Sequence, residues 1–354
     1  MKLFYKTKIL INGMFPLKNY KIDGYVEKTG IVDDKMIDSE HPDYIFYSAG
    51  HLLNSCYQCV GKQGTFYEYF ESEDLAEYEV NDELSMYEIQ KIFLEEQTQK
   101  IDLLQEKIRL LTGLAIALPV FLITIYKDDA FYTYVGNITW TITTLKVPDY
   151  DDHMKQTLKN RLCFRMSDST ITELKEKNPR YKRALNFYNN SFESSDIGVR
   201  FTLLFSSLEA LFDITAENVT TEVSKYASKI LFLNKKQSRS SKWKLKNYYD
   251  VRSKYIHGND GFEITNKIEH NLREYVREIL LIYWSISISY NITDAQEIKN
   301  LLDHIDNDTI HVSVQIFVKY LRTDPDKFGL LYGKIRDNFL NGNYHVLSSE
   351  AYTI

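Results

Sequence analysis

An arginine and a histidine stand five residues apart in the last third of the chain, at Arg252 and His257. The arginine side chain can direct two parallel hydrogen bonds at the oxygens of a phosphate group, and it keeps its charge at any physiological pH. The histidine can take up or release a proton near neutrality because its ordinary pKa lies there. Together the two residue types could stabilise and protonate a phosphodiester while it is being cut, without a metal ion.

The same two residues also have ordinary structural explanations. Arg252 falls on the apolar stripe of an expected helix, in line with Leu245, and a buried arginine is costly unless it is paired. An ion pair with a core acid such as Glu209, or a side chain that reaches outward to solvent, would meet that need. His257 precedes Gly258, a strong helix stop, where a histidine commonly interacts with the helix dipole. The residues alone leave both explanations open.

The spacing of the pair restricts how it could act. Five steps of about 100° place two side chains roughly 140° apart around an ideal helix. Arg252 and His257 therefore do not share one face of a single helix. They can converge only if the helix unwinds at Gly258, or if a second copy of the chain supplies a partner.

The surrounding residues resemble a known family. Residues 249–258 read YDVRSKYIHG, which is similar to the Tyr-x-x-Arg-Ser-Lys-x-x-His-Gly pattern of the Apea-like branch of HEPN ribonucleases, with its R-x4-H motif. The segment FTLLFSSLEALF at 201–212 resembles the aromatic-rich helix of that family. The segments YKRALNFYNNSF at 181–192 and LREYVREILLIYW at 272–284 resemble its preceding and closing helices. The resemblance covers about residues 178–290.

The resemblance implies metal-independent endoribonuclease activity at a dimeric active site, with Arg252 and His257 as its catalytic residues. Ser253 occupies a position where many HEPN nucleases carry Asn, Asp or His, and it is a candidate for a supporting role together with Lys254 and Glu209. The resemblance also implies bacterial anti-phage defence by abortive infection in the cytoplasm. RNA, often tRNA, is then the expected substrate, and a homodimer and a phage-derived trigger or partner protein are the expected assemblies.

A second interpretation keeps the fold and drops the chemistry. The chain would then be a non-catalytic HEPN module that binds a partner or serves as a scaffold in a defence or toxin–antitoxin complex. Arg252 and His257 would have structural roles only. A ribonuclease assay of the wild type and a His257 variant separates the two interpretations.

A basic window lies next to this motif. Residues 221–260 contain ten Lys or Arg and three acidic residues, within a chain whose net charge is −6. Because attraction to phosphates is local, this window is a candidate RNA-binding surface, and its alternative is a solvated lysine-rich loop. Trp243 could stack on an unpaired base or pack in the core. The predicted RNA-binding residues are Lys235, Lys236, Arg239, Lys242, Lys244, Lys246 and Trp243.

Other chemistries lack their sequence signatures. The chain contains no phosphate-binding G-x-x-x-x-G-K-[ST] loop, no G-x-G-x-x-G and no H-E-x-x-H. Cys56 and Cys59 form half a zinc site at most, and with Cys163 they are too few for a disulfide framework, which favours a reducing compartment. We therefore expect no bound metal and no cofactor.

The first 150 residues predict an α+β domain. Residues 2–11, 43–53 and 65–72 are rich in aromatic and β-branched residues and are bounded by turn sequences, which indicates strands. Residues 82–118 have helical periodicity, and residues 120–146 return to strand character around a polar turn. An acidic stretch near residue 150 marks the predicted boundary. This domain, residues 1–150, is a candidate sensor or regulator.

The remainder predicts an all-helical HEPN bundle at residues 155–300, with a helical extension at 301–354. Pro179 suits the first position of one helix, and Asp196 or Ser195 suits the cap of the next. We predict a basic loop over residues 234–246, then helices over about 244–257 and 266–287. Thr293 and Gln296 suit the capping box of a further helix.

One uncharged stretch, residues 110–126, is at the short limit for a membrane span. Its 17 residues include Gly113 and Pro119. We expect a buried helix end, a break at Pro119 and a buried strand from Val120, and therefore no membrane association. A membrane-associated effector remains the alternative.

Overall fold

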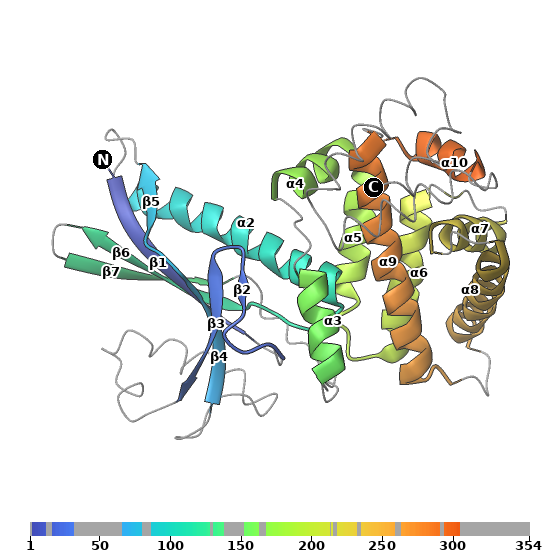
Figure 1. Ribbon diagram of the computed structural model, residues 1–354, viewed down its shortest axis with the longest axis horizontal. Coiled ribbons are helices and arrows are strands. Elements are labelled where there is room, and N and C mark those ends of the chain that lie inside the picture. Colours follow the sequence, from blue (N-terminus) through green and yellow to red (C-terminus); the bar gives the residue numbers. More distant parts are fainter. Residues whose placement is uncertain are drawn as a thin grey trace, which may run out of the picture. The chain divides into compact units, whose positions relative to one another are not determined.

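The computed structural model describes residues 2–11, 16–31, 66–79, 86–127, 130–137, 152–162, 168–212, 214, 218–231, 235–258, 263–290 and 294–304. The chain divides into two compact units (Figure 1). One consists of Met1–Arg109 and Leu114–Lys159, and the other of Leu110–Gly113 and Asn160–Ile354. The domain limits predicted from the sequence stay predictions. Most of the predicted extension at 301–354 lies outside the described residues, as do the predicted strand at 43–53 and all three cysteines.

The first unit contains an antiparallel sheet with the strand order β2-β3-β4-β1-β6-β7, and β5 also pairs with β1. The strands are β1 (Lys2–Leu10), β2 (Lys21–Ile22), β3 (Tyr25–Ile31), β4 (Phe66–Ser72), β5 (Ala76–Glu79), β6 (Val120–Lys127) and β7 (Ala130–Asn137). The predicted strands at 2–11 and 65–72 are confirmed, and so is the strand character after residue 120. Strands β2, β3 and β5 were not predicted from the sequence.

Two features fix the sheet locally. Asp23 and Gly24 have φ of 48° and 79°, and they form the two-residue turn that joins β2 to β3 with the hand that hairpins favour. Along β1, Leu3 and Ile9 are buried while Phe4 is exposed, which is the alternation expected of a sheet with one covered face.

Helix α2 (Met86–Thr112) lies along that covered face (Figure 1). The Phe93 ring packs edge-on against Tyr5, with 4.8 Å between the ring centroids, and Gln97 donates a hydrogen bond to the Tyr5 hydroxyl. The helix ends before Gly113, whose φ is +74°. Gly113 thus ends the helix by adopting the left-handed conformation that other residues avoid.

The expected break in the apolar stretch 110–126 is therefore placed wrongly, since the helix stops at Gly113 and not at Pro119. The strand from Val120 is confirmed. Within the described parts of the chain, no helix combines the length and the apolar character that crossing a bilayer requires.

The second unit consists of helices. They are α4 (Asp168–Lys177), α5 (Pro179–Asn190), α6 (Ile197–Phe212), α7 (Val219–Leu231), α8 (Lys235–Ile256), α9 (Asn266–Tyr290) and α10 (Ala295–His304). Helix α3 (Asp152–Leu162) begins in the first unit and ends in the second. An antiparallel sheet followed mostly by helices is the coarse fold class expected from the sequence. Helix α6 carries the core, because Phe201, Leu204, Leu208 and Leu211 are all fully buried.

Local sequence explains the starts of α5 and α6. Pro179 opens α5, and the Asn178 side chain accepts a hydrogen bond from the Tyr181 backbone N–H at 3.0 Å. Asp196 caps α6, since its Oδ1 accepts from the backbone N–H groups of Gly198 at 2.7 Å and Val199 at 2.9 Å. The predicted Pro179 start and the Asp196 alternative for the cap are confirmed.

Two predictions for the helical unit are wrong. Residues 235–246 are not a loop, because α8 runs without interruption from Lys235 to Ile256. This stretch contains no Gly or Pro, and its Lys, Gln and Arg residues favour helices. A loop was predicted there because the start of the stretch has no apolar stripe. The cap of α10 is Asp294 and not Thr293, since the Asp294 Oδ1 accepts from Gln296 N at 2.7 Å.

Candidate active site on helix α8

Arg252 lies on α8 and is held by two residues. Its Nη1 donates to the Tyr249 hydroxyl at 2.9 Å and lies 3.4 Å from the Glu209 Oε1 on α6. Its guanidinium carbon also lies 5.1 Å from the centre of the Tyr249 ring, within the range of a cation–π contact. Glu209 is thus the acid that the sequence analysis named as a partner for Arg252.

Tyr249 connects the arginine to the carboxylate. Its hydroxyl donates to Glu209 Oε1 at 2.8 Å while it accepts from Arg252, and its ring packs edge-on against Phe205. Burial, followed by the hydrogen bond to Glu209, raises the pKa of Tyr249 to about 12, although the nearby Arg252 acts to lower it. The phenol therefore stays protonated, and it fixes the guanidinium from one side.

The Arg252 side chain is partly exposed. Within the part of the chain that the structure describes, the hydrogen bonds of Arg252 involve Nη1 alone. The Nε is buried without a partner, and 19% of the side chain is exposed. An arginine that is held on one side by Tyr249 and Glu209 and is partly exposed can direct its remaining donors at a phosphate with little loss of rotational freedom.

His257 follows the last residue of α8 and is exposed to solvent. Its backbone N–H donates to the Ser253 carbonyl at 3.0 Å, and Gly258 then takes a φ of +64°. The predicted helix stop at Gly258 is confirmed. The exposed imidazole can exchange protons with solvent or a ligand.

The candidates for support differ in position. Glu209 contacts Arg252, as described above. Ser253 and Lys254 are half-buried on the last turns of α8. For Ser253 the structure records the carbonyl contact to His257. The role of Tyr249 as a bridge was missed. The sequence signals for it were its spacing of three residues from Arg252 on one helix and its place as the first residue of the YDVRSKYIHG motif.

The predicted RNA-binding residues line α8. Lys244 and Lys246 are exposed, Lys242 is half-buried, and the side chains of Lys235, Lys236 and Arg239 lie outside the described residues. Trp243 is 65% exposed, so it does not pack in the core. This leaves a large aromatic side chain in solvent between two lysines.

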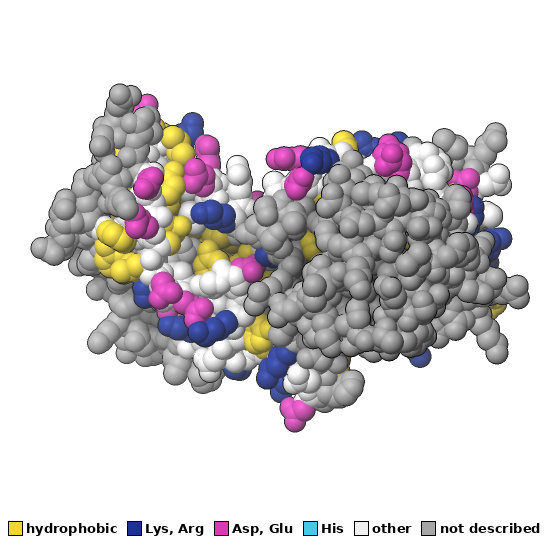
Figure 2. Space-filling view, turned by 45° about the horizontal axis from the view of Figure 1, so that its top comes forward, with side chains coloured by type: hydrophobic (Ala, Val, Ile, Leu, Met, Phe, Trp, Pro, Cys, Tyr) yellow, Lys and Arg dark blue, Asp and Glu magenta, His cyan; other side chains and the backbone are white. Residues whose placement is uncertain are grey.

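The sheet unit has lysines of a different kind. Lys18, Lys21 and Lys28 pair with Glu68, Glu73 and Glu71. Figure 2 shows basic and acidic side chains next to one another on the visible face of this unit, on the left of the view. Paired charges of this type attract polyanions weakly, so Lys18, Lys21 and Lys28 are weaker RNA-binding candidates than Lys244 and Lys246.

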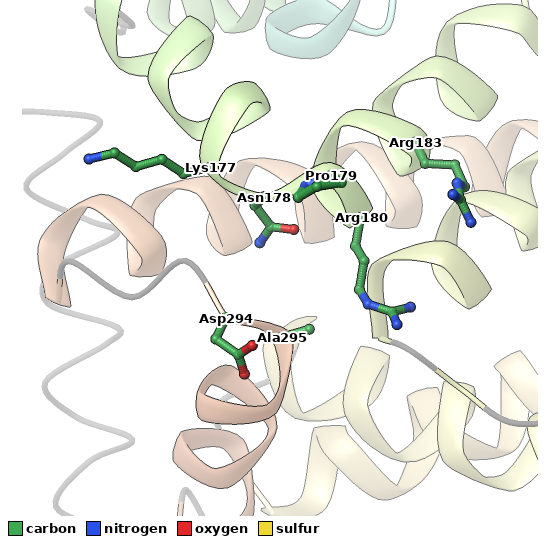
Figure 3. A pocket seen from close by; sticks show the side chains of 7 residues that line it. All are labelled: Lys177, Asn178, Pro179, Arg180, Arg183, Asp294 and Ala295. Atoms are coloured by element: carbon green, nitrogen blue, oxygen red, sulfur yellow. The ribbon is translucent and has the colours of Figure 1, made fainter.

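A hollow of about 340 Å³ lies between the end of α4 and the starts of α5 and α10 (Figure 3). Its charged lining residues are Lys177, Arg180, Arg183 and Asp294. Lys177 pairs with Glu173 and points away from the other lining side chains, and Arg183 lies apart from Arg180. The hollow contains none of the predicted site residues, and its cations do not converge on one point.

Comparison with family models, with curated proteins and with solved structures gave no match to this chain. Among the described residues, no group of three or more His, Cys, Asp or Glu side chains could hold a metal ion. The residues of α6 and α8 described above are therefore the features that bear on function.

Proposed function

We propose that this chain is a metal-independent endoribonuclease of the HEPN type, similar to the Apea-like branch. The observation that supports it most is the arrangement at the end of α8. Arg252 is held on one edge by Tyr249 and Glu209, and an exposed His257 follows the last turn of the same helix. The two residue types that RNA cleavage needs are therefore accessible next to a lysine-bearing helix surface.

The proposed reaction uses the ribose 2′-hydroxyl as nucleophile. This hydroxyl gives its proton to a base and attacks the phosphorus, the bond to the 5′ oxygen breaks, and that oxygen takes a proton from an acid. The products are a 2′,3′-cyclic phosphate and a 5′-hydroxyl end. His257 serves as base or acid, and Arg252 balances the extra negative charge that develops on the phosphate oxygens.

A homodimer completes this site. On an ideal helix Arg252 and His257 point roughly 140° apart, so one copy of α8 does not direct both at a single phosphate. Two copies of α8 that face one cleft supply two histidines, one as base and one as acid. The site then depends on assembly, which is a simple way to keep a ribonuclease inactive.

The exposed face of α8 would guide the RNA. Lys244 and Lys246 can contact backbone phosphates, and Trp243 can stack on an unpaired base. By the resemblance, the biological role is anti-phage defence in the bacterial cytoplasm through cleavage of RNA such as tRNA. The N-terminal unit would sense a phage-derived trigger.

A metal-free cleavage assay tests the proposal. The wild type should cut single-stranded RNA in the presence of a chelator, and His257→Ala should lose activity by about 10²-fold or more, because acid–base catalysis is worth that much. His270→Ala is the matched control, since His270 is also an exposed histidine but lies on a different helix, α9. Loss of activity in both variants, or cutting by the wild type only with added metal, would contradict the proposal.

The ion pair of Arg252 with Glu209 also favours a second candidate function. An arginine that is already paired meets its structural need without a substrate. The chain would then be a non-catalytic binding module with the same helical fold. Absence of cleavage by the wild type, together with unchanged RNA or partner binding in His257→Ala, would favour this module.

A further inference from the structure

The last turn of α8 is fastened to the first turn of α6 by Tyr255, two residues before His257. The Tyr255 hydroxyl donates to Asp196 Oδ1 at 3.0 Å. The same oxygen accepts the backbone N–H groups of Gly198 and Val199, so Asp196 caps α6 and holds Tyr255 at once. The hydrogen bond from Val199, followed by that from Tyr255, lowers the pKa of the Asp196 carboxyl, which is therefore charged near neutrality.

The ring of Tyr255 depends on a glycine. A Cβ at position 198 would overlap three atoms of the Tyr255 ring, so the ring lies directly against the backbone of α6. Gly198 is buried, although 38% of Tyr255 is exposed. Glycine has no Cβ and therefore leaves this space in the first turn of α6. The contact of the ring with the backbone depends on Gly198.

The position of this contact matters for the proposed site. Helix ends fray, because their last carbonyl groups lack partners within the helix. At the end of α8, Ile256 and His257 are both exposed, so their own packing does not hold the turn. Tyr255 gives this turn its attachment to α6. Helix α6 also carries Glu209, which holds Arg252 through Tyr249.

We propose that Tyr255, with Asp196 and Gly198, is a positioning device for His257. It fixes the end of α8 to the same helix that fixes Arg252, and so it sets where the imidazole lies relative to the guanidinium. Tyr255 does not touch the substrate in this account. The expected effect of Tyr255 on the cleavage rate rests on the proposed ribonuclease function. Its expected effect on the stability of the last turn of α8 does not.

The first test replaces Tyr255 by phenylalanine, which keeps the ring and removes the hydrogen bond. Amide hydrogen exchange at His257 and Gly258 should become about three- to tenfold faster, as expected for loss of one hydrogen bond between two exposed side chains. The kcat for RNA should fall by a similar factor while KM stays unchanged, because the phosphate-binding lysines are intact. Tyr248→Phe is the control, since its hydroxyl bonds to no described residue.

Two further variants separate positioning from general destabilisation. Gly198→Ala should displace the ring and lower kcat more than Tyr255→Phe does. Asp196→Asn should keep both exchange and kcat within about twofold of the wild type, because asparagine also caps helices and its oxygen can accept from Tyr255.

The outcomes are distinguishable from those of the proposed function. Unchanged exchange at His257 in Tyr255→Phe overturns the positioning role, whatever the enzyme does. Faster exchange with an unchanged kcat overturns it as well. If the wild type cuts no RNA, the ribonuclease proposal fails, and the exchange measurement alone still decides whether Tyr255 holds the end of α8.

Discussion

At the scale of single residues, the account depends on how Arg252 is held. Glu209 and Arg252 are 43 positions apart in sequence, and their ion pair could be anticipated because a buried arginine needs an acid. The bridging hydroxyl of Tyr249 could not be anticipated, since it depends on the packing of α6 against α8. The contact of Tyr255 with Gly198 was missed for the same reason.

Removing the Tyr249 hydroxyl should weaken the site without unfolding it. In Tyr249→Phe, Arg252 keeps its ion pair with Glu209 but loses its hydrogen bond to the phenol. We expect kcat for RNA to fall about tenfold and the free energy of unfolding to fall by about 1–3 kcal/mol, because the hydroxyl loses two part-buried hydrogen bonds, one to Glu209 and one from Arg252. Steady-state kinetics and urea unfolding measure the two effects. A kcat equal to that of the wild type would show that Arg252 needs no such support.

At the scale of elements, the sequence predicted most helices and the strands with a clear pattern. Helix α5 was evident from its proline and its apolar stripe, and α6 from apolar residues spaced three and four apart. The start of α8 was not evident, because residues 235–242 are all polar and such a sequence is typical of a loop as well as of an exposed helix. Strand β3 was missed since Glu27, Lys28 and Thr29 give it little apolar character.

A proline tests the extended start of α8 directly. Ser240 is exposed and lies inside the helix as described, whereas the sequence predicted a loop there. Ser240→Pro should lower the free energy of unfolding by about 3 kcal/mol, and Ser240→Ala should leave it unchanged or slightly raise it. Circular dichroism during thermal unfolding measures both. A tolerated proline would mean that this stretch is a loop after all.

Because Asp196 caps α6 as a carboxylate, we predict that the stability of the protein depends on pH in the acidic range. Its folded pKa lies below the ordinary value, mainly because of the hydrogen bond from the Val199 N–H. A lowered carboxyl pKa adds stability above the unfolded value of about 4, and this contribution is lost as the pH falls from there through the folded pKa. Between about pH 5 and pH 2, the free energy of unfolding should therefore decrease less in Asp196→Asn than in the wild type. Parallel curves would contradict this.

At the scale of the whole molecule, the sequence analysis separated a sheet-containing first part from a helical second part, and the chain does divide into two compact units. A role for the first unit could not be predicted, because its described residues bring together paired charges and a covered sheet face. The structure of a single chain also does not indicate whether two copies assemble. The regulatory role of the first unit and the homodimer are both parts of the proposed function.

The lysines of α8 should act on binding and not on chemistry. Replacing Lys244 and Lys246 by glutamine removes two exposed charges. We expect KM for RNA to rise, kcat to remain unchanged and the slope of log affinity against log salt to decrease by about 1.4, at roughly 0.7 for each phosphate contact with a single strand. Affinity titrations at several salt concentrations test this. An unchanged slope would place the RNA elsewhere.

The central claim is that Arg252 and His257 together cut RNA through its own 2′-hydroxyl. The most direct measurement is sequencing of RNA ends in cells after induction of the wild type, beside Arg252→Ala. We expect new 2′,3′-cyclic phosphate and 5′-hydroxyl ends at defined positions with the wild type, and their loss with Arg252→Ala. The same ends in both strains, or no new ends in either, would contradict the account.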